Sequence, residues 1–262
     1  MIIHSLTKGQ QTMPRKKSAL HLVDEQTQSK PVSNGCKMRI EDLITVDAMT
    51  ETQGQFFSQY SSGAQAMLLH GAAGTGKTFI AVYKALEEAL QRGGLKQKVV
   101  IVRSAVPSRD IGYLPGDEVD KSEVYMSPYI SMCNELFPEK QNPFGRLVEQ
   151  KFLSFMLTSF VRGITLDNSL IIVDECQNMN DMELNSIITR VGHNSKIILC
   201  GDFRQTDLYK RGDMSGLQKF MVIAENMPSF KIIEFTTDDI VRGDLVKEYL
   251  LAKIQYEDTV AA

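Results

Sequence analysis

The stretch that decides the fold is "GAAGTGKT", residues 71–78. It matches the pattern G-x-x-x-x-G-K-[ST], in which backbone N–H groups surround phosphate oxygens and the following helix directs its positive end at them. The residues before it, "AMLLH" at 66–70, are typical of a buried strand, and residues 77–91 after it have helical periodicity. A loop between a strand and a helix predicts a nucleoside-triphosphate site.

Residues in this motif have different expected tasks. The loop that would surround the phosphates consists of Gly71, Ala72, Ala73, Gly74, Thr75 and Gly76. Lys77 is expected to reach the terminal phosphates as a point charge, and the Thr78 hydroxyl is expected to ligate Mg²⁺. A glycine-rich turn that binds no nucleotide is the alternative, and the strand and helix on either side count against it.

The composition is that of a globular chain. Of its 262 residues, 43% are hydrophobic and 23% are charged, which allows one domain with a sizeable core plus appendages. No apolar run reaches 18 residues, and the N-terminus lacks the apolar region of a secretory signal, so we expect no membrane partner and a cytoplasmic location. The chain has four cysteines, Cys36, Cys133, Cys176 and Cys200, and no C-x-x-C pair, which argues against zinc and disulfides. Two of the four are expected in the core.

Charge is distributed unevenly along the chain. Residues 1–40 carry seven Lys or Arg and two acidic side chains, a net charge of +5, so the total of −3 leaves −8 for residues 41–262. The first segment is polar and weakly periodic, which predicts a mobile basic arm ahead of a single P-loop ATPase domain over 41–262. The arm is a candidate for contact with nucleic acid or an acidic partner, and a solvated tail is the simpler alternative.

Beyond the arm, apolar strand-like runs alternate with helical segments. A first helix is expected to be capped near Thr50 and to end at 61–63. Further strands are expected at 98–103, 168–175, 195–202 and 230–235, and helices at 77–91, 180–191, 213–227 and 241–254. Continuous apolar runs are typical of strands buried on both faces. The pattern predicts an open, mostly parallel α/β sheet with helices on both faces, a RecA-like P-loop NTPase fold, with a long insertion at 104–167.

Two carboxylates end the strand expected at 168–175. Asp174 is expected to lie near the Mg²⁺ shell, and Glu175 to polarise an attacking water. Acids at strand ends also serve as helix caps, but the phosphate loop upstream favours the functional interpretation.

The next strand ends in "CGDFRQ", residues 200–205. Ligands of open α/β sheets bind at the carboxyl ends of strands, which places Asp202 and Gln205 at the same edge as the phosphate loop. Because Gln205 can both donate and accept hydrogen bonds, it suits a γ-phosphate sensor that orients water. An ordinary turn is the alternative.

Near the end, Arg242 lies at the start of the last expected helix. An arginine there can neutralise transition-state charge, in its own subunit or across an interface. The alternative is a solvent-exposed salt bridge to Asp239 or Asp244.

Together these motifs resemble the PhoH family, in the same order. The stretches that carry the resemblance are "GAAGTGKT", "VRSAV", "IGYLPGD", "YMSPYI", "VRGIT", "LIIVDECQN", "NSKIILCGDFRQTDL", "SGL" and "DDIVRGDLVKEYL". The similarity covers about residues 50–254. It implies one ATPase core related to superfamily 1 helicases, with ATP and Mg²⁺ as cofactors and RNA or another single-stranded nucleic acid as partner; the family includes compact phage members, which would act in the host cytoplasm.

The resemblance also implies site residues. It supports Asp174 and Glu175 as the Mg²⁺ and water pair, Gln205 as the sensor and Arg242 as an arginine finger. "TETQGQFF" resembles the helicase stretch whose glutamine hydrogen-bonds adenine, which points to Gln53, with Gln55 as the alternate. The chain departs from the family at Cys176 for an alanine, Ser104 for a proline and Ile164 for an arginine. The last two weaken the nucleic-acid inference more than the ATP inference.

A superfamily 1 helicase places one ATP between two such cores, and this chain has room for one. We therefore predict a homo-oligomeric ring, a hexamer, with Arg242 acting across the subunit boundary. Cationic and aromatic side chains of the insertion region are the candidates for a single-strand contact: Arg103, Arg109, Lys121, Tyr113 and Tyr125. Nearby acids oppose this interpretation and leave an oligomer contact as the alternative: Asp110, Asp117, Glu118, Asp120 and Glu123.

Two other function classes share the phosphate loop. A P-loop small-molecule kinase would need a basic lid and an acceptor pocket, and the "DECQ" and "GDFRQ" stretches favour water activation instead. A nucleotide-binding switch or oligomeric scaffold with negligible turnover would show no stimulation by RNA.

Overall fold

The computed structural model describes residues 37–91, 97–104, 118–202 and 216–261. The chain divides into Met1–Lys37 and a compact unit, Met38–Ala262, to which the described helices and strands belong. The arm expected over residues 1–40 lies almost wholly outside the described residues. Met38, however, is 1% exposed and belongs to the core of the compact unit.

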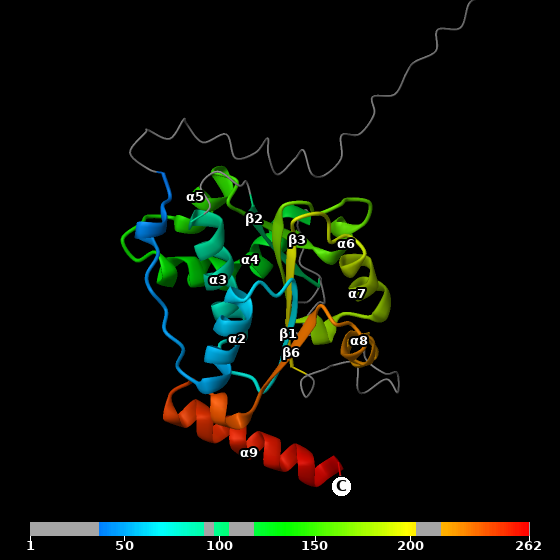
Figure 1. Cartoon of the computed structure of the whole chain (residues 1–262). Coiled ribbons are helices and arrows are strands. Elements are labelled where there is room, and N and C mark those ends of the chain that lie inside the picture. The colour runs from blue at the N-terminus through cyan, green and yellow to red at the C-terminus, as the bar shows by residue number, and fades with distance from the viewer. Residues whose placement is uncertain (1–36, 92–96, 105–117, 203–215, 262) are drawn as a thin grey trace, which may run out of the picture. The chain divides into compact units, whose positions relative to one another are not determined.

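The centre of the unit is a six-stranded sheet in which every pairing is parallel (Figure 1). The strand order is β3-β2-β4-β5-β1-β6. The strands are β1 (Ala66–Gly71), β2 (Lys98–Arg103), β3 (Leu153–Leu157), β4 (Ser169–Asp174), β5 (Lys196–Gly201) and β6 (Phe230–Phe235). Five of them match the predicted strands to within one residue at each end, and the prediction of an open parallel α/β sheet is confirmed.

Helices cover both faces of the sheet, as predicted (Figure 1). One face carries α2 (Glu51–Ser61), α3 (Lys77–Gln91), α4 (Glu118–Leu136) and α5 (Pro143–Glu149). The other carries α6 (Thr158–Val161), α7 (Asp181–Ile188) and α8 (Gly216–Glu225), and α9 (Asp244–Ala261) lies at one end of the unit. The expected cap of α2 is present, because the Thr50 hydroxyl accepts a hydrogen bond from the backbone N–H of Gln53.

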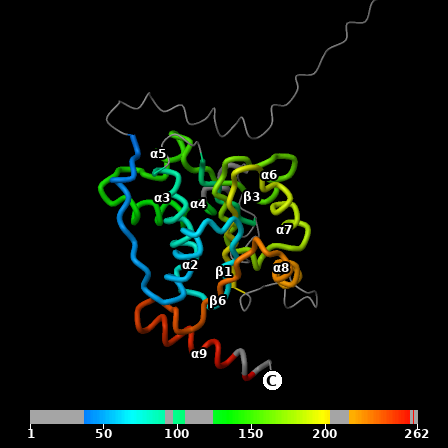
Figure 2. Tube along the Cα trace, in the orientation of Figure 1, coloured from blue at the N-terminus to red at the C-terminus, as the bar shows by residue number. Residues whose placement is uncertain are grey.

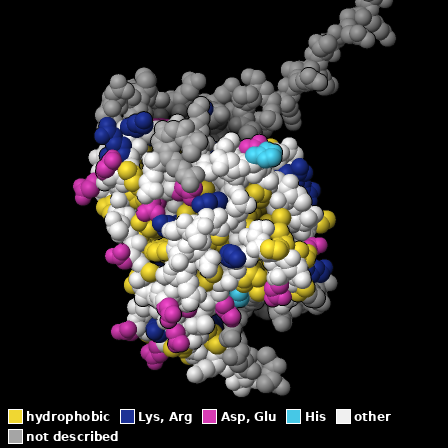
Figure 3. All heavy atoms as spheres, viewed as in Figure 1, with side chains coloured by type: hydrophobic (Ala, Val, Ile, Leu, Met, Phe, Trp, Pro, Cys, Tyr) yellow, Lys and Arg dark blue, Asp and Glu magenta, His cyan; other side chains and the backbone are white. Residues whose placement is uncertain are grey.

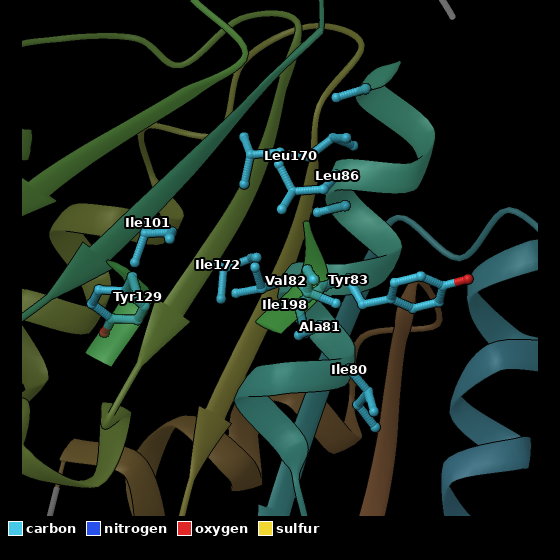
Figure 4. Close-up of a cluster of buried hydrophobic side chains, with 14 of the residues drawn as sticks. Ile80, Ala81, Val82, Tyr83, Leu86, Ile101, Tyr129, Leu170, Ile172 and Ile198 are labelled. Atoms are coloured by element: carbon cyan, nitrogen blue, oxygen red, sulfur yellow. The ribbon is translucent and has the colours of Figure 1, made fainter. Parts of the chain in front are cut away.

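Each strand supplies side chains to two separate cores. In β1, Met67 and Leu69 belong to the core under α2–α5, whereas Leu68 faces the core under α6–α8. Figure 4 shows the first core, with Leu86 of α3 beside Leu170 of β4. Because successive residues of a strand point to opposite faces, two buried faces require an apolar residue at every position. This requirement explains the uninterrupted apolar runs of the sequence.

The region expected as an insertion, 104–167, adds a strand that the sequence analysis does not predict. It contains α4, α5, β3 and α6, and β3 extends the sheet beyond β2, with Leu153 opposite Val99. The three central residues of β3 are half-buried, as befits an edge strand. A five-residue run with this mixed exposure has a weak apolar signal, which is why it escapes a search for continuous buried runs.

The segment of residues 38–50, which includes a 3-10 turn at Ile40–Asp42, ties the insertion to α2 (Figure 2). Its backbone is anchored where the Ile44 N–H donates to the carbonyl oxygen of Leu136, the last residue of α4, at 3.0 Å. The Lys140 ammonium pairs with the Asp42 carboxylate at 2.8 Å. These contacts make residues from Met38 onward part of the folded unit.

The described cysteines are core residues. Cys133, Cys176 and Cys200 are all buried thiols, which confirms the expectation that two cysteines lie in the core. Burial raises the pKa of the Cys133 thiol to about 12. Among the described helices, none is both long and apolar enough to cross a bilayer.

Gly71 provides a test of how closely β6 holds the phosphate loop. A Cβ atom at Gly71 would lie 2.0 Å from the Phe235 carbonyl oxygen, and the Gly71 φ angle is +113°. Gly163 has a similar φ of +84°, but no atom lies within 4 Å of its Cβ position. Gly163→Ala should therefore lower the free energy of unfolding by about 1–2 kcal/mol through backbone strain. Gly71→Ala should lower it by about 3 kcal/mol more, because backbone must also move.

Urea unfolding of both variants beside the wild type measures this difference. Equal losses for Gly71→Ala and Gly163→Ala would contradict the close approach of β6 to the loop.

Candidate nucleotide site

The phosphate loop connects β1 to α3, and neighbouring elements hold it from outside. The Ala72 N–H donates to the Phe235 carbonyl oxygen at 2.8 Å, at the end of β6. The Gly74 carbonyl oxygen accepts from the Val241 N–H at 3.0 Å. These contacts fix loop residues that otherwise depend on glycine for their positive φ angles.

Lys77 begins α3 and is directed back into the loop. Its ammonium group donates to the carbonyl oxygens of Ala72 at 2.6 Å and Gly71 at 3.1 Å, and lies 3.2 Å from the Thr75 hydroxyl. Burial lowers the Lys77 pKa, and the charge of Asp202 opposes that shift. The loop thus contains a buried cation held by carbonyl oxygens, at the position from which this motif directs a lysine to the terminal phosphates.

The carboxylate of Asp174 is shared between two hydroxyl groups. At the end of β4, its Oδ1 accepts from the Thr78 hydroxyl at 2.6 Å, and its Oδ2 accepts from the Tyr129 hydroxyl at 2.6 Å. A hydroxyl and a carboxylate oxygen are the hard donors that Mg²⁺ prefers, and Mg²⁺ keeps water and substrate oxygens in its remaining positions. The pair Thr78 and Asp174 therefore fits Mg²⁺, which would neutralise phosphate charge when bound.

Glu175 adopts an unusual backbone conformation directly after β4. Its φ of 52° is in the left-handed region, where a residue with a side chain carries strain, and such strain is often stored at functional sites. The Gln177 amide donates to its carboxylate at 2.5 Å and accepts from the Asp202 N–H at 3.1 Å. Burial, and secondly the charge of Asp174, raises the Glu175 pKa. The carboxylate is thus oriented by a side chain tied to the end of β5.

The predicted adenine contact, Gln53, is a buried support of the phosphate loop. It is 2% exposed, its amide donates to the Thr75 carbonyl oxygen at 3.0 Å, and its oxygen accepts from the Met49 N–H at 2.8 Å. The alternate, Gln55, is exposed and lines a groove of about 610 Å³ between α2 and β6. Contact of either residue with adenine stays a prediction.

Arg242 lies beside the phosphate loop of its own chain. A Cβ atom at Gly74 would lie 3.0 Å from the Arg242 Cγ. None of the ion pairs among the described residues involves Arg242. The alternative of a salt bridge to Asp239 or Asp244 is therefore not found among the described residues, and Asp239 is buried and accepts hydrogen bonds from the N–H and the hydroxyl of Thr236.

Several predicted residues cannot be placed. Gln205 and the insertion residues Arg109, Tyr113, Asp110 and Asp117 lie outside the described residues.

Arg103 is one of the candidates for the single-strand contact, and that contact stays a prediction. It ends β2 and is half-buried, opposite Asp174 in the parallel register of β2 and β4. Ser104, the residue that departs from the family pattern, lies 3.3 Å from the Glu183 carboxylate of α7. Arg103 therefore belongs to the metal side of the site.

Sequence reasoning misses two residues of this site, Tyr129 and Gln177. Gln177 lies two positions after Glu175, and this short spacing is a signal that a search for partners of Glu175 could use. Tyr129 lies 45 positions before Asp174, and no spacing rule connects them.

Comparison with known proteins agrees with the motifs. The sequence model of the PhoH-like protein family matches residues 45–253. The chain belongs to this family. A PhoH-like protein of Bacillus subtilis is 35% identical over 183 residues, which are 70% of this chain and 56% of that protein. A PhoH-like protein of Mycobacterium tuberculosis is 33% identical over 189 residues, 72% of this chain and 52% of that protein.

The chain thus spans about half the length of these PhoH-like relatives. Among solved structures, the large terminase of a thermophilic bacteriophage aligns with 76% of this chain and 49% of that chain, at 12% identity and a TM-score of 0.43. The PhoH resemblance inferred from the motifs is confirmed by the family match.

The two possible roles of Gln53 predict different nucleotide selectivity. If Gln53 supports the loop, Gln53→Leu should weaken the binding of ATP and GTP by the same factor, about tenfold, because it leaves a buried carbonyl unpaired. Gln55→Leu is the control, since Gln55 is exposed on the same helix. Equilibrium titration with fluorescent ATP and GTP analogues measures both affinities, and a loss confined to ATP would show that Gln53 reads adenine instead.

Proposed function

We propose that this chain is a Mg²⁺-dependent ATPase of the PhoH type, coupled to single-stranded RNA or DNA. One observation carries the proposal: the Thr78 hydroxyl of the phosphate loop meets the Asp174 carboxylate at 2.6 Å, so the phosphate and metal elements form one site. Glu175 is the next residue, oriented by Gln177 at the same edge of the sheet. This arrangement supports hydrolysis as well as nucleotide binding.

Each residue has a role that its environment supports. Lys77 exchanges its carbonyl partners for phosphate oxygens, which are stronger acceptors because they are charged. Thr78 and Asp174 hold Mg²⁺, which supplies charge neutralisation when bound. Glu175 accepts a proton from the attacking water, and the raised pKa of this buried carboxyl makes it a better base than an exposed glutamate. Gln205 is proposed as the γ-phosphate sensor.

Arg242 is proposed to neutralise transition-state charge. Its stem lies over Gly74 of the same chain, which supports a role within one subunit and differs from the expectation that it acts across a boundary. Assembly into a hexameric ring remains a proposal that rests on the need for a second core around ATP.

Coupling to RNA rests on the family resemblance. On the face shown in Figure 3, basic and acidic side chains of the described residues are interspersed. This face therefore lacks the continuous basic stripe that is typical of a groove that binds the phosphate backbone of a nucleic acid. RNA stimulation of turnover is therefore the decisive observation for this part of the proposal.

Phosphate release from ATP, with Mg²⁺ and with or without single-stranded RNA, tests the proposal. The wild type should turn over and be accelerated by RNA. Lys77→Ala should bind ATP at least about tenfold more weakly, because the loop loses its buried cation. Glu175→Gln should bind ATP and turn over about 100-fold or more slowly, because it lacks the base.

Lys84→Ala is the matched control, because Lys84 is a half-buried lysine of the same helix, paired with Glu87. ATP binding without phosphate release in every condition would replace the ATPase proposal by the nucleotide switch. A phosphorylated acceptor in place of free phosphate would indicate a kinase.

A further inference from the structure

Helix α4 places one side chain of the insertion at the metal side of the site. Tyr129 is fully buried, and its ring lies beside Ile101 of β2 (Figure 4) and packs against Phe155 of β3, with ring centroids 5.6 Å apart. Its hydroxyl donates to Asp174 Oδ2 at 2.6 Å, a short hydrogen bond of the kind formed with a charged acceptor. A residue of the insertion thus reaches the end of β4.

The two carboxylate oxygens of Asp174 accept hydrogen bonds from different hydroxyl groups. Oδ1 accepts from Thr78, whose hydroxyl oxygen is the proposed Mg²⁺ ligand, so this carboxylate oxygen faces the metal side of the site. Oδ2 accepts from Tyr129, whose rigid ring is fixed by the core. The Tyr129 hydrogen bond is therefore the contact that can orient the carboxylate plane from the side of the core, apart from the oxygen that faces Thr78.

Arg103 reinforces this arrangement from the end of β2. Arg103 is the register partner of Asp174 in the β2–β4 pair, which places its positive charge beside the carboxylate that accepts from Tyr129.

We propose that Tyr129 is a positioning residue that orients the Asp174 carboxylate for Mg²⁺. The inference rests on the proposed function, because it assigns Asp174 to the metal. Outer partners of metal ligands set ligand orientation and affinity, and their loss typically lowers metal affinity by about 10–100-fold. A purely structural tyrosine would affect folding stability and leave the Mg²⁺ requirement unchanged.

The test compares Tyr129→Phe with Tyr60→Phe. Tyr60 is a matched control: it is also buried, and its hydroxyl donates to the Glu88 carboxylate at 2.7 Å, in α3 and outside the site. Both substitutions remove one hydroxyl and keep the ring. Equilibrium binding of a fluorescent ATP analogue is titrated with Mg²⁺, so no turnover is needed. Affinity in EDTA and thermal unfolding are measured alongside.

Tyr129→Phe should raise the half-saturating Mg²⁺ concentration about tenfold and leave the affinity in EDTA unchanged within about twofold. Tyr60→Phe should lower thermal stability and keep the wild-type Mg²⁺ response. If both variants show the wild-type Mg²⁺ response, Tyr129 is structural and the inference fails, while the proposed function stands. If wild-type ATP binding does not respond to Mg²⁺, the proposed metal site fails as well.

A double substitution shows whether Tyr129 acts through Asp174. In Asp174→Asn, adding Tyr129→Phe should change the half-saturating Mg²⁺ concentration by less than about twofold, because the carboxylate that it orients is gone. The same tenfold change in both backgrounds would overturn the assignment.

Discussion

The site depends on one carboxylate that joins three parts of the chain. Asp174 ends a central strand. Its two carboxylate oxygens accept hydrogen bonds from the hydroxyls of Thr78, at the start of α3, and Tyr129, in α4. Burying a carboxylate without hydrogen-bond partners costs free energy, so the hydroxyls of Thr78 and Tyr129 stabilise Asp174 in its buried position. The phosphate loop, the sheet and the insertion therefore meet at a single group.

The phosphate loop is held by residues distant from it in sequence. Phe235 at the end of β6, Val241 before α9 and Gln53 in α2 each hydrogen-bond a loop backbone group. Asp239 lies between Phe235 and Val241, and its carboxylate accepts from the Thr236 N–H directly after β6. A local motif thus obtains its geometry from elements that are distant from it in sequence.

The sequence is sufficient for the elements whose signal is local. The loop at 71–78, the five long apolar strands and the pair Asp174 and Glu175 follow from spacing and from the rule that parallel strands end at a common edge. The edge strand β3 is not predicted, because its three central residues are only half-buried and its apolar run is short. The sequence does not predict the role of Tyr129 or the support of the loop by Gln53 for another reason. Tertiary packing decides which groups they contact, and a hydroxyl or an amide can hydrogen-bond many different groups.

A crystal structure of the chain with Mg²⁺ and a non-hydrolysable ATP analogue tests the central claim most directly. We predict that the Thr78 hydroxyl oxygen coordinates Mg²⁺, with Asp174 on the metal or in its water shell and Tyr129 still donating to that carboxylate. Phosphates bound away from Lys77, or a metal held without Thr78 and Asp174, would contradict the account.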